Sequence, residues 1–241
     1  MQYSNKMKFI SPYQFSLFAL SMFITMLLTA CKSSERSVVY NATGYDGIDV
    51  SRHNGVIDWK KVSKNRNIKY VFVKATEGYG HVDKNYLYNA QQAHKHHLKV
   101  GIYHYFTSRS SAVAQFSWFR QQANRTWQDI APVIDVEDIR GWKNSQQLQD
   151  SLAVFIRLVK KHYNCPPIIY THRNFYNTHL APRFNDHHLF IAAYSAREPR
   201  INGSDYSIWQ YTDAGRINGV KGNVDLSRLG RGMDLKKILL P

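Results

Sequence analysis

The sequence predicts an α/β fold in which a parallel sheet closes into a barrel. From residue 44 onward, short runs of β-branched and aromatic residues alternate with longer helical patterns, as in proteins built from repeated strand and helix units. About eight strand-like runs fall within roughly 200 residues, which favours a barrel over an open sheet. The chain is 44% hydrophobic, enough for a large core. We therefore expect one domain over 44–241, a single irregular, flattened TIM-like β/α barrel.

The expected elements alternate regularly in the first half of this domain and less regularly in the second. Runs rich in β-branched and aromatic residues predict strands at 47–51, 69–75, 99–106, 131–137, 166–172, 189–195, 206–212 and 223–229. Apolar residues at helical spacing predict helices at 59–66, 86–98, 110–124 and 145–163. The helical pattern weakens after the fifth strand, so we expect the second half of the barrel to be irregular.

The first thirty residues have the composition of an export signal. Lys6 and Lys8 precede an apolar run that ends just before Cys31. The residues before this cysteine, Leu-Thr-Ala, have the form of a bacterial lipobox and resemble lipoprotein signal peptides. We expect a signal peptide at 1–30, lipidation of Cys31 and a polar tether at 31–43, which would place the protein in the cell envelope, on the outer membrane of a Gram-negative-type bacterium. An uncleaved membrane helix is the alternative, although the apolar run is shorter than the roughly 20 residues that a span needs.

The charge balance narrows the choice of partner. Lysine and arginine number 32 against 17 aspartate and glutamate, a formal net charge of +15. Such a basic chain favours an anionic partner: a cell wall, a membrane surface or a nucleic acid. Export disfavours nucleic acid, and the sequence carries no motif for binding it. The only cysteines are Cys31 and Cys165, so lipidation of the first excludes a disulfide and leaves stability to the core. We expect a monomer.

Acidic residues recur near the C-terminal ends of three expected strands. Side chains alternate between the two faces of a strand, so in a barrel every second side chain faces the interior. In the strands at 47–51, 131–137 and 223–229, the large apolar residues share one face. The acids on the opposite, inward face are Asp49, Asp135, Glu137 and Asp225. Each acid alone could cap a turn or pair with a cation, but independent caps would not share one strand face. Barrel enzymes place their chemistry at this end of the strands.

Clustered carboxyl groups suit the cleavage of glycosidic bonds. Burial and mutual repulsion raise the pKa of one group, which donates a proton to the leaving oxygen, while an ionised neighbour stabilises or attacks the cationic sugar. Glu137 is the expected acid, because its side chain is longer and its neighbours are acidic. Asp135, deeper along the strand, is expected to stay ionised. Asp138, on the other strand face, is expected to cap a turn or to meet solvent. Two carboxyl groups need no metal and no other cofactor, so we expect none.

Six segments form an ordered set of motifs across the expected domain. They are GIDVSRHNGVIDW at 47–59, YVFVKATEG at 70–78, VGIYHYF at 100–106, PVIDVED at 132–138, IIYTH at 168–172 and IWQYTDAGRINGVKGNVDL at 208–226. Taken together and in this order, they resemble glycoside hydrolase family 25, the muramidases called Chalaropsis-type lysozymes. The resemblance implies an irregular β/α barrel and hydrolysis of the β-1,4 bond between N-acetylmuramic acid and N-acetylglucosamine, with the glycan strands of peptidoglycan as partner.

The resemblance also implies roles for the inward acids. Glu137 matches the general acid and base, Asp135 its partner, and Asp49 and Asp225 the remaining acids of the groove. Whether an aspartate or the 2-acetamido group of the substrate is the second participant stays open. Ser227 stands where the family often has Asn, which puts one local hydrogen bond in doubt. A catalytically silent wall-binding protein, or a hydrolase of another N-acetylated glycan, is the alternative function.

Aromatic residues at strand ends are candidates for sugar binding, because sugar rings stack their apolar faces on aromatic planes. The candidates are Trp209, Tyr170, Tyr194 and Tyr103. Trp209 is favoured, because a polar residue follows it near the end of its strand. Packing in the barrel core is the alternative for these rings. Lys74 and Glu77 fall on opposite faces if their strand is regular, so we assign neither to the site.

Overall fold

The computed structural model describes residues 44–195 and 197–241. The signal peptide expected at 1–30, the lipidation site Cys31 and the tether expected at 31–43 lie outside the described residues. Among the helices of the described residues, none combines the length and the apolar character needed to cross a membrane.

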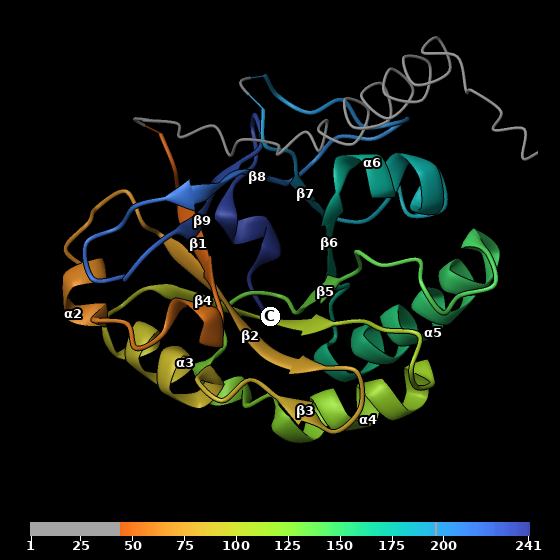
Figure 1. Cartoon of the computed structure of the whole chain (residues 1–241), viewed down its shortest axis with the longest axis horizontal. Helices are drawn as coiled ribbons and strands as arrows, with labels where there is room; N and C mark the ends of the chain where they lie inside the picture. Colours follow the sequence, from red (N-terminus) through yellow and green to blue (C-terminus); the bar gives the residue numbers. More distant parts are fainter. Residues whose placement is uncertain (1–43, 196) are drawn as a thin grey trace, which may run out of the picture. The chain divides into compact units, whose positions relative to one another are not determined.

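The strands of the described residues close into a barrel, as the sequence predicts. In order around the barrel they are β1 (Gly47–Val50), β9 (Val224–Leu229), β8 (Ile208–Gly215), β7 (Leu189–Ala192), β6 (Ile168–His172), β5 (Val133–Asp135), β4 (Lys99–Tyr105) and β2 (Tyr70–Glu77). β2 pairs back with β1 and so closes the ring, and the short β3 (His81–Val82) extends the end of β2. Figure 1 shows the strands arranged around a common centre.

Helices lie against the outside of the strands. They are α2 (Trp59–Val62), α3 (Tyr86–Lys95), α4 (Ala112–Gln122), α5 (Ser145–Tyr163) and the short α6 (Arg173–Phe175). Single helical turns are η1 (Arg52–Asn54), η2 (Arg125–Trp127), η3 (Tyr176–Leu180) and η4 (Leu235–Ile238). Figure 1 shows α2 to α5 following one another along the outer face of the first strands. These helices occupy the places that the apolar periodicity predicts.

The local sequence explains where α5 begins and ends. The side chain of Asn144 accepts a hydrogen bond from the backbone N–H of Gln147 and so caps the first turn. Leu148, Leu152 and four further residues at helical spacing are buried against the sheet. The helix ends at Asn164, whose left-handed φ of 57° turns the chain away from the helix axis.

The second half of the barrel departs from the regular pattern. β9 runs antiparallel to both of its neighbours, β8 and β1, whereas the sequence predicted a parallel sheet. The physical reason is the connection at 216–223, which is shorter than the crossover of about a dozen residues that parallel neighbours need. Within the described residues, no helix separates β7 from β8. The predicted irregularity of this half is therefore confirmed.

Alternate strand residues pack into two apolar cores. The inner core fills the barrel and includes Tyr70, Phe72, Val133, Ile168, Phe190, Ile208 and Ile238. The outer core joins the strands to the helices and includes Ile48, Val71, Ile134, Ile169, Leu152 and Phe155. The large inner rings fit because small residues face them: a Cβ at Gly101 would lie only 2.4 Å from the ring of Phe72. The polar residues at the C-terminal ends of the strands thus lie next to the apolar inner core.

Candidate active site

Four predicted acids meet at one end of the barrel. Asp225 lies near the N-terminal end of its strand and not near the C-terminal end as predicted, because β9 is antiparallel to its neighbours. In the antiparallel pair of β1 and β9, Asp49 lies directly opposite Asp225. Asp135 is the last residue of β5, and Glu137 follows it. Together with Phe72, Tyr103, Val133, Tyr170, Phe190 and Gln210, these four acids line one pocket of about 140 Å³, which we call the acidic pocket. Strand alternation therefore brings together the residues that the sequence analysis selected.

The chain around Glu137 keeps the alternation although the strand is shorter than predicted. β5 ends at Asp135, but the N–H of Val136 still donates to the carbonyl of Tyr170 at 2.9 Å. Val136 is buried in the outer core. Glu137 consequently points to the other side, toward the pocket, and its side chain is 26% exposed. Glu137 thus lies nearer to solvent than Asp135, which is 7% exposed.

Burial and neighbouring carboxylates raise the pKa of three acids of the pocket. Burial raises the pKa of Asp49 well above its usual value, and the charge of Asp225 adds to the effect. Burial also raises the pKa of Asp135 strongly, followed by the charge of Glu137, while Lys74 opposes the shift. The pKa of Asp225 rises to about 7 through burial and the charges of Asp213 and Glu137. The pocket therefore favours the protonated forms of Asp49, Asp135 and Asp225 more than water does.

The sequence predicts that Asp135 stays ionised. Burial raises its pKa and favours the protonated form, whereas the charge of Lys74 favours the ionised form. Among the described residues, no N–H or hydroxyl group donates to its buried Oδ1. An acceptor oxygen without a donor is costly in a buried place, so this atom is ready to receive a hydrogen bond from a bound molecule.

Gln210 connects the acids to the neighbouring tyrosines. Its Nε2 donates to Oδ2 of Asp49 at 3.0 Å. Its Oε1 accepts from the hydroxyl of Tyr170 at 2.8 Å and from that of Tyr194 at 2.9 Å. One buried amide thus fixes three side chains from different strands and loops. The sequence analysis missed this residue, although its strand parity, opposite to that of Trp209, was a usable signal.

The favoured aromatic candidate, Trp209, is wrong as a sugar-binding residue. Its side chain is 1% exposed and packs in the outer core. Its Nε1 donates to the carbonyl of Ala193 at 2.8 Å, and the guanidinium of Arg228 lies 4.3 Å from its ring centre. The reason is alternation, because Trp209 precedes the inward Gln210 and must face outward.

The tyrosine candidates lie at or near the pocket. Tyr103 and Tyr170 line it, and Tyr194, 39% exposed, stands beside it through its bond to Gln210. Nε2 of His172, at the end of β6, lies 3.9 Å from Oε1 of Glu137, a neighbour that the sequence analysis did not select. Across the described residues, no group of three or more His, Cys, Asp or Glu side chains is placed to hold a metal ion.

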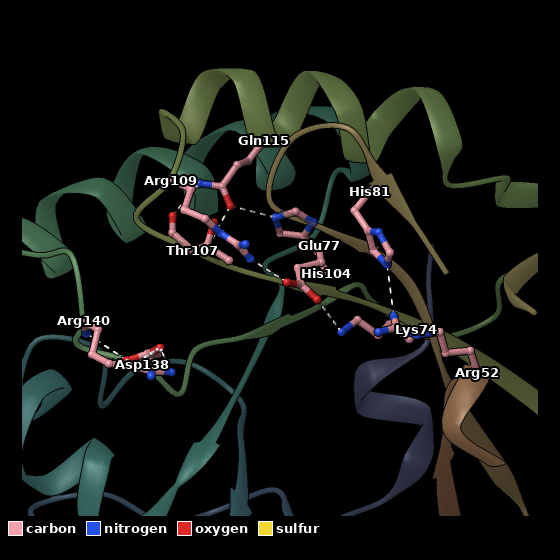
Figure 2. Close-up of polar contacts among 10 residues, drawn as sticks. All are labelled: Arg52, Lys74, Glu77, His81, His104, Thr107, Arg109, Gln115, Asp138 and Arg140. Carbon is pink, nitrogen blue, oxygen red and sulfur yellow. Dashed lines mark hydrogen bonds and ion pairs between the residues drawn. The ribbon is translucent and has the colours of Figure 1, made fainter. Parts of the chain in front are cut away.

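A second hollow adjoins the acidic pocket. β2 contains a bulge between Lys74 and Thr76, where its register against β4 shifts. The bulge brings Lys74 and Glu77 to the same side, and Nζ of Lys74 lies 3.0 Å from Oε2 of Glu77 (Figure 2). Glu77 also pairs with Arg109, at 2.6 Å. The placement on opposite faces, predicted for a regular strand, is thus wrong for these two residues because the strand is not regular. Asp138 lies at the surface, as predicted, and pairs with Arg140.

A family model, curated relatives and a solved structure resemble this chain. The model of the family described as glycosyl hydrolases family 25 matches residues 48–220. The uncharacterized protein YegX of Escherichia coli is 36% identical over 185 residues, which cover 75% of this chain and 68% of YegX. The autolytic lysozyme of Clostridium acetobutylicum is 31% identical over 188 residues, 78% of this chain and 56% of that protein. The structure of a family 25 glycosyl hydrolase from Bacillus anthracis aligns with a TM-score of 0.73 at 29% identity, covering 84% of this chain and 96% of that one.

Proposed function

Because the chain belongs to glycosyl hydrolase family 25, we propose that it is a muramidase that cleaves the β-1,4 bond between N-acetylmuramic acid and N-acetylglucosamine in peptidoglycan. It is a glycoside hydrolase of the lysozyme type. The observation that carries the finer proposal is the acidic pocket, in which Glu137 stands at the solvent side of the buried Asp135. A proton donor beside a second carboxyl group is what cleavage of a glycosidic bond requires.

In the proposed reaction, Glu137 gives its proton to the glycosidic oxygen as the bond from that oxygen to the sugar C1 breaks. The leaving sugar departs with a hydroxyl group, and Glu137 then takes a proton from the water that attacks C1. The electron pair that stabilises C1 in between comes either from Asp135 or from the carbonyl oxygen of the 2-acetamido group. The second route is supported by Oδ1 of Asp135, which is buried without a donor and suits the acetamido N–H.

Gln210 and the tyrosines have a positioning role in this proposal. By donating to Asp49, Gln210 fixes one acid of the pocket, and Tyr170 and Tyr194 fix the amide in turn. The sugar therefore meets side chains that are already oriented, which lowers the reorganisation that the reaction needs.

The products of digestion test the bond that is cleaved. The full chain is incubated with purified peptidoglycan, the products are reduced with borohydride, and their masses are determined. Cleavage of the proposed bond leaves N-acetylmuramic acid at the new reducing end, so muramitol should be found there. Reduced N-acetylglucosamine at that position, or the absence of any new reducing end, would contradict the proposal.

We also propose that the protein is exported and anchored by a lipid on Cys31 in the cell envelope, with the barrel acting on the wall from the outer membrane. The support lies in the sequence before residue 44, with its basic start, apolar run and lipobox. Metabolic labelling with a fatty acid tests it: the Cys31→Ser variant should lose the label and leave the outer-membrane fraction. Cys165→Ser is the matched control and should keep both. A labelled Cys31→Ser variant would refute the anchor.

A further inference from the structure

The second hollow is larger than the acidic pocket and has a different character. It measures about 540 Å³, against about 140 Å³ for the acidic pocket. Its charged lining consists of Lys74, Arg109, Arg140, Glu77 and Asp138. Three cations face two carboxylates, so the hollow keeps an excess of positive charge after every internal pair is formed. The reaction proposed above uses none of these side chains.

The two arginines retain free donor groups. Among the described residues, Arg109 bonds only Oε1 of Glu77, through Nη2, and its side chain is 73% exposed. Arg140 engages Asp138 through Nε and Nη2 and is 88% exposed. A guanidinium group has five N–H donors in a planar fork that matches a carboxylate. Each arginine can therefore hold its internal partner and still receive a second anion.

A buried polar network fixes the loop that carries Arg109. Gln115 of α4 is fully buried, and its Nε2 donates to the carbonyls of Thr107 and Ser110, both at 2.8 Å. Its Oε1 accepts from the N–H of Thr107 at 3.0 Å, and Nε2 of His104 lies 3.2 Å from the same oxygen. Figure 2 shows His104 beside Gln115, joined to it by a dashed line, and Arg109 reaching toward Glu77. Buried hydrogen bonds thus hold the backbone on both sides of Arg109.

The loops of the two arginines are also tied to each other. The hydroxyl of Ser108 donates to the carbonyl of Arg140 at 2.9 Å. Gly141, with φ of +81°, allows this approach, because a Cβ there would lie 2.1 Å from Oγ of Ser108. Oγ1 of Thr107, which lines the same hollow, is buried with no partner among the described residues. The hollow therefore combines two oriented guanidinium groups with an unused hydroxyl group.

The second hollow and the acidic pocket are lined by consecutive residues of the chain, Asp138 and Glu137. Lys74 lies close enough to Asp135 to lower its pKa against the effect of burial. Tyr105, which lines the second hollow, is the β4 partner of Asp135, and Nζ of Lys74 lies 4.9 Å from its ring centre. A sugar bound at the acids therefore lies near the cations of the second hollow.

We propose that the second hollow binds a carboxylate of the peptide that the muramic acid residue carries. This inference rests on the proposed function, since it assigns one part of the same substrate. N-acetylated sugar rings carry no charge, whereas wall peptides carry free carboxylates, which suit paired arginines. The peptide is attached to the sugar through a short side chain, so a bound glycan brings it beside the acids.

The experiment compares substrates that differ only in peptide charge. Soluble glycan fragments with intact peptides are used with free carboxylates and after amidation of those carboxylates. The full chain should show a kcat/KM about three- to tenfold higher for the free form, the range expected of partly exposed charge-assisted contacts. Arg109→Ala and Arg140→Ala should each reduce this ratio toward one. Arg183→Ala removes an arginine that is paired with Asp150 at 2.5 Å and lines neither hollow, and it should leave the ratio unchanged.

The possible outcomes separate this inference from the proposed function. Wild-type protein that is active on both substrates at equal rates would overturn the subsite and leave the muramidase intact. Wild-type protein inactive on both would overturn the muramidase itself. Strands whose peptides have been removed enzymatically retain only the carboxylate next to the sugar ring. If these strands keep the full, arginine-dependent advantage over the amidated form, the ligand is that carboxylate and the peptide is excluded. A ratio of one in wild-type protein overturns the subsite even if an arginine variant does not fold.

Discussion

The two neighbouring hollows use the same acidic residue types in opposite ways. In the acidic pocket, burial and nearby carboxyl groups raise the pKa of Asp135 and Asp225. In the second hollow, burial would raise the pKa of Glu77, but hydrogen bonds from Lys74 and Arg109 outweigh it and lower the pKa. The hydrogen bond from Arg140 likewise lowers the pKa of Asp138. Partners, rather than residue type, decide whether a carboxyl group is available for proton transfer or for ion pairing.

The largest effect expected from this contrast is the loss of activity in Glu137→Gln. The amide keeps the size of the side chain but cannot donate a proton to the glycosidic oxygen, so kcat should fall by about 10³-fold. The release of reducing ends from peptidoglycan measures it, and a thermal melt close to that of the wild type shows that the fold is retained. Asp150→Asn, which removes an exposed acid paired with Arg183, is the control. Activity within tenfold of the wild type would remove Glu137 from the role of acid.

The second effect concerns Asp225 and the dependence of stability on pH. Its pKa of about 7 lies above the usual value, so the folded protein binds more protons than the unfolded chain at intermediate pH. The resulting stabilisation is complete below about pH 4 and is lost as the pH rises toward about 7. The free energy of unfolding should therefore fall over this window, by about 2 to 4 kcal/mol from this group.

Asp225→Asn does not titrate, so its unfolding free energy should change less between these limits. Urea unfolding at a series of pH values measures the slope for both proteins. Equal slopes would show that Asp225 is not the group responsible, and attention would pass to Asp49 and Asp135, whose pKa values are also raised.

The third effect tests the amide that orients the acidic pocket. Gln210→Leu removes the donor to Asp49 and the acceptor of two tyrosine hydroxyls, so kcat/KM should fall by about ten- to a hundredfold. Gln128→Leu is the matched control, because Gln128 is also buried and donates to the carbonyl of Ile130, away from the acids. Both variants should lose stability. If both also lost the same activity, the effect of Gln210 would be structural only.

The contrast between the hollows also shows what the sequence could and could not predict. Strand alternation is a geometric property of the backbone, so it placed Asp49, Asp135 and Asp225 in one interior without any knowledge of packing. Alternation also argued against Trp209, because Gln210 and Thr212 lie on the opposite face of its strand, but the apolar character of the ring favoured it as a sugar-binding residue. The sequence could therefore identify the acids better than the aromatic residues around them.

The second hollow depends on features that no short pattern reveals. Lys74 and Glu77 come together because β2 contains a bulge, and the composition of β2 does not predict that bulge. Arg109 and Arg140 lie on loops, where the position of a side chain depends on contacts that are distant in the chain, such as those of Gln115. The antiparallel direction of β9 could have been predicted, because the sequence shows that the connection before it is too short for a parallel crossover. The bulge in β2 and the conformations of the loops are therefore the main features that could not be predicted from the sequence.

The smallest expected effect is that of Glu77→Gln, and its sign is opposite to that of Asp225→Asn. The pKa of Glu77 is lowered, so its stabilisation is present above the usual pKa of a glutamate and is lost as the pH falls. Because the pair with Arg109 is partly exposed and screened, the variant should lose less than about 1 kcal/mol near neutral pH. The difference should disappear as the pH falls through the lowered pKa of Glu77, and it should shrink in concentrated salt. Urea unfolding measures the difference in unfolding free energy. A difference that grows on acidification would mean that burial raises the pKa of Glu77, as it does for the acids of the acidic pocket.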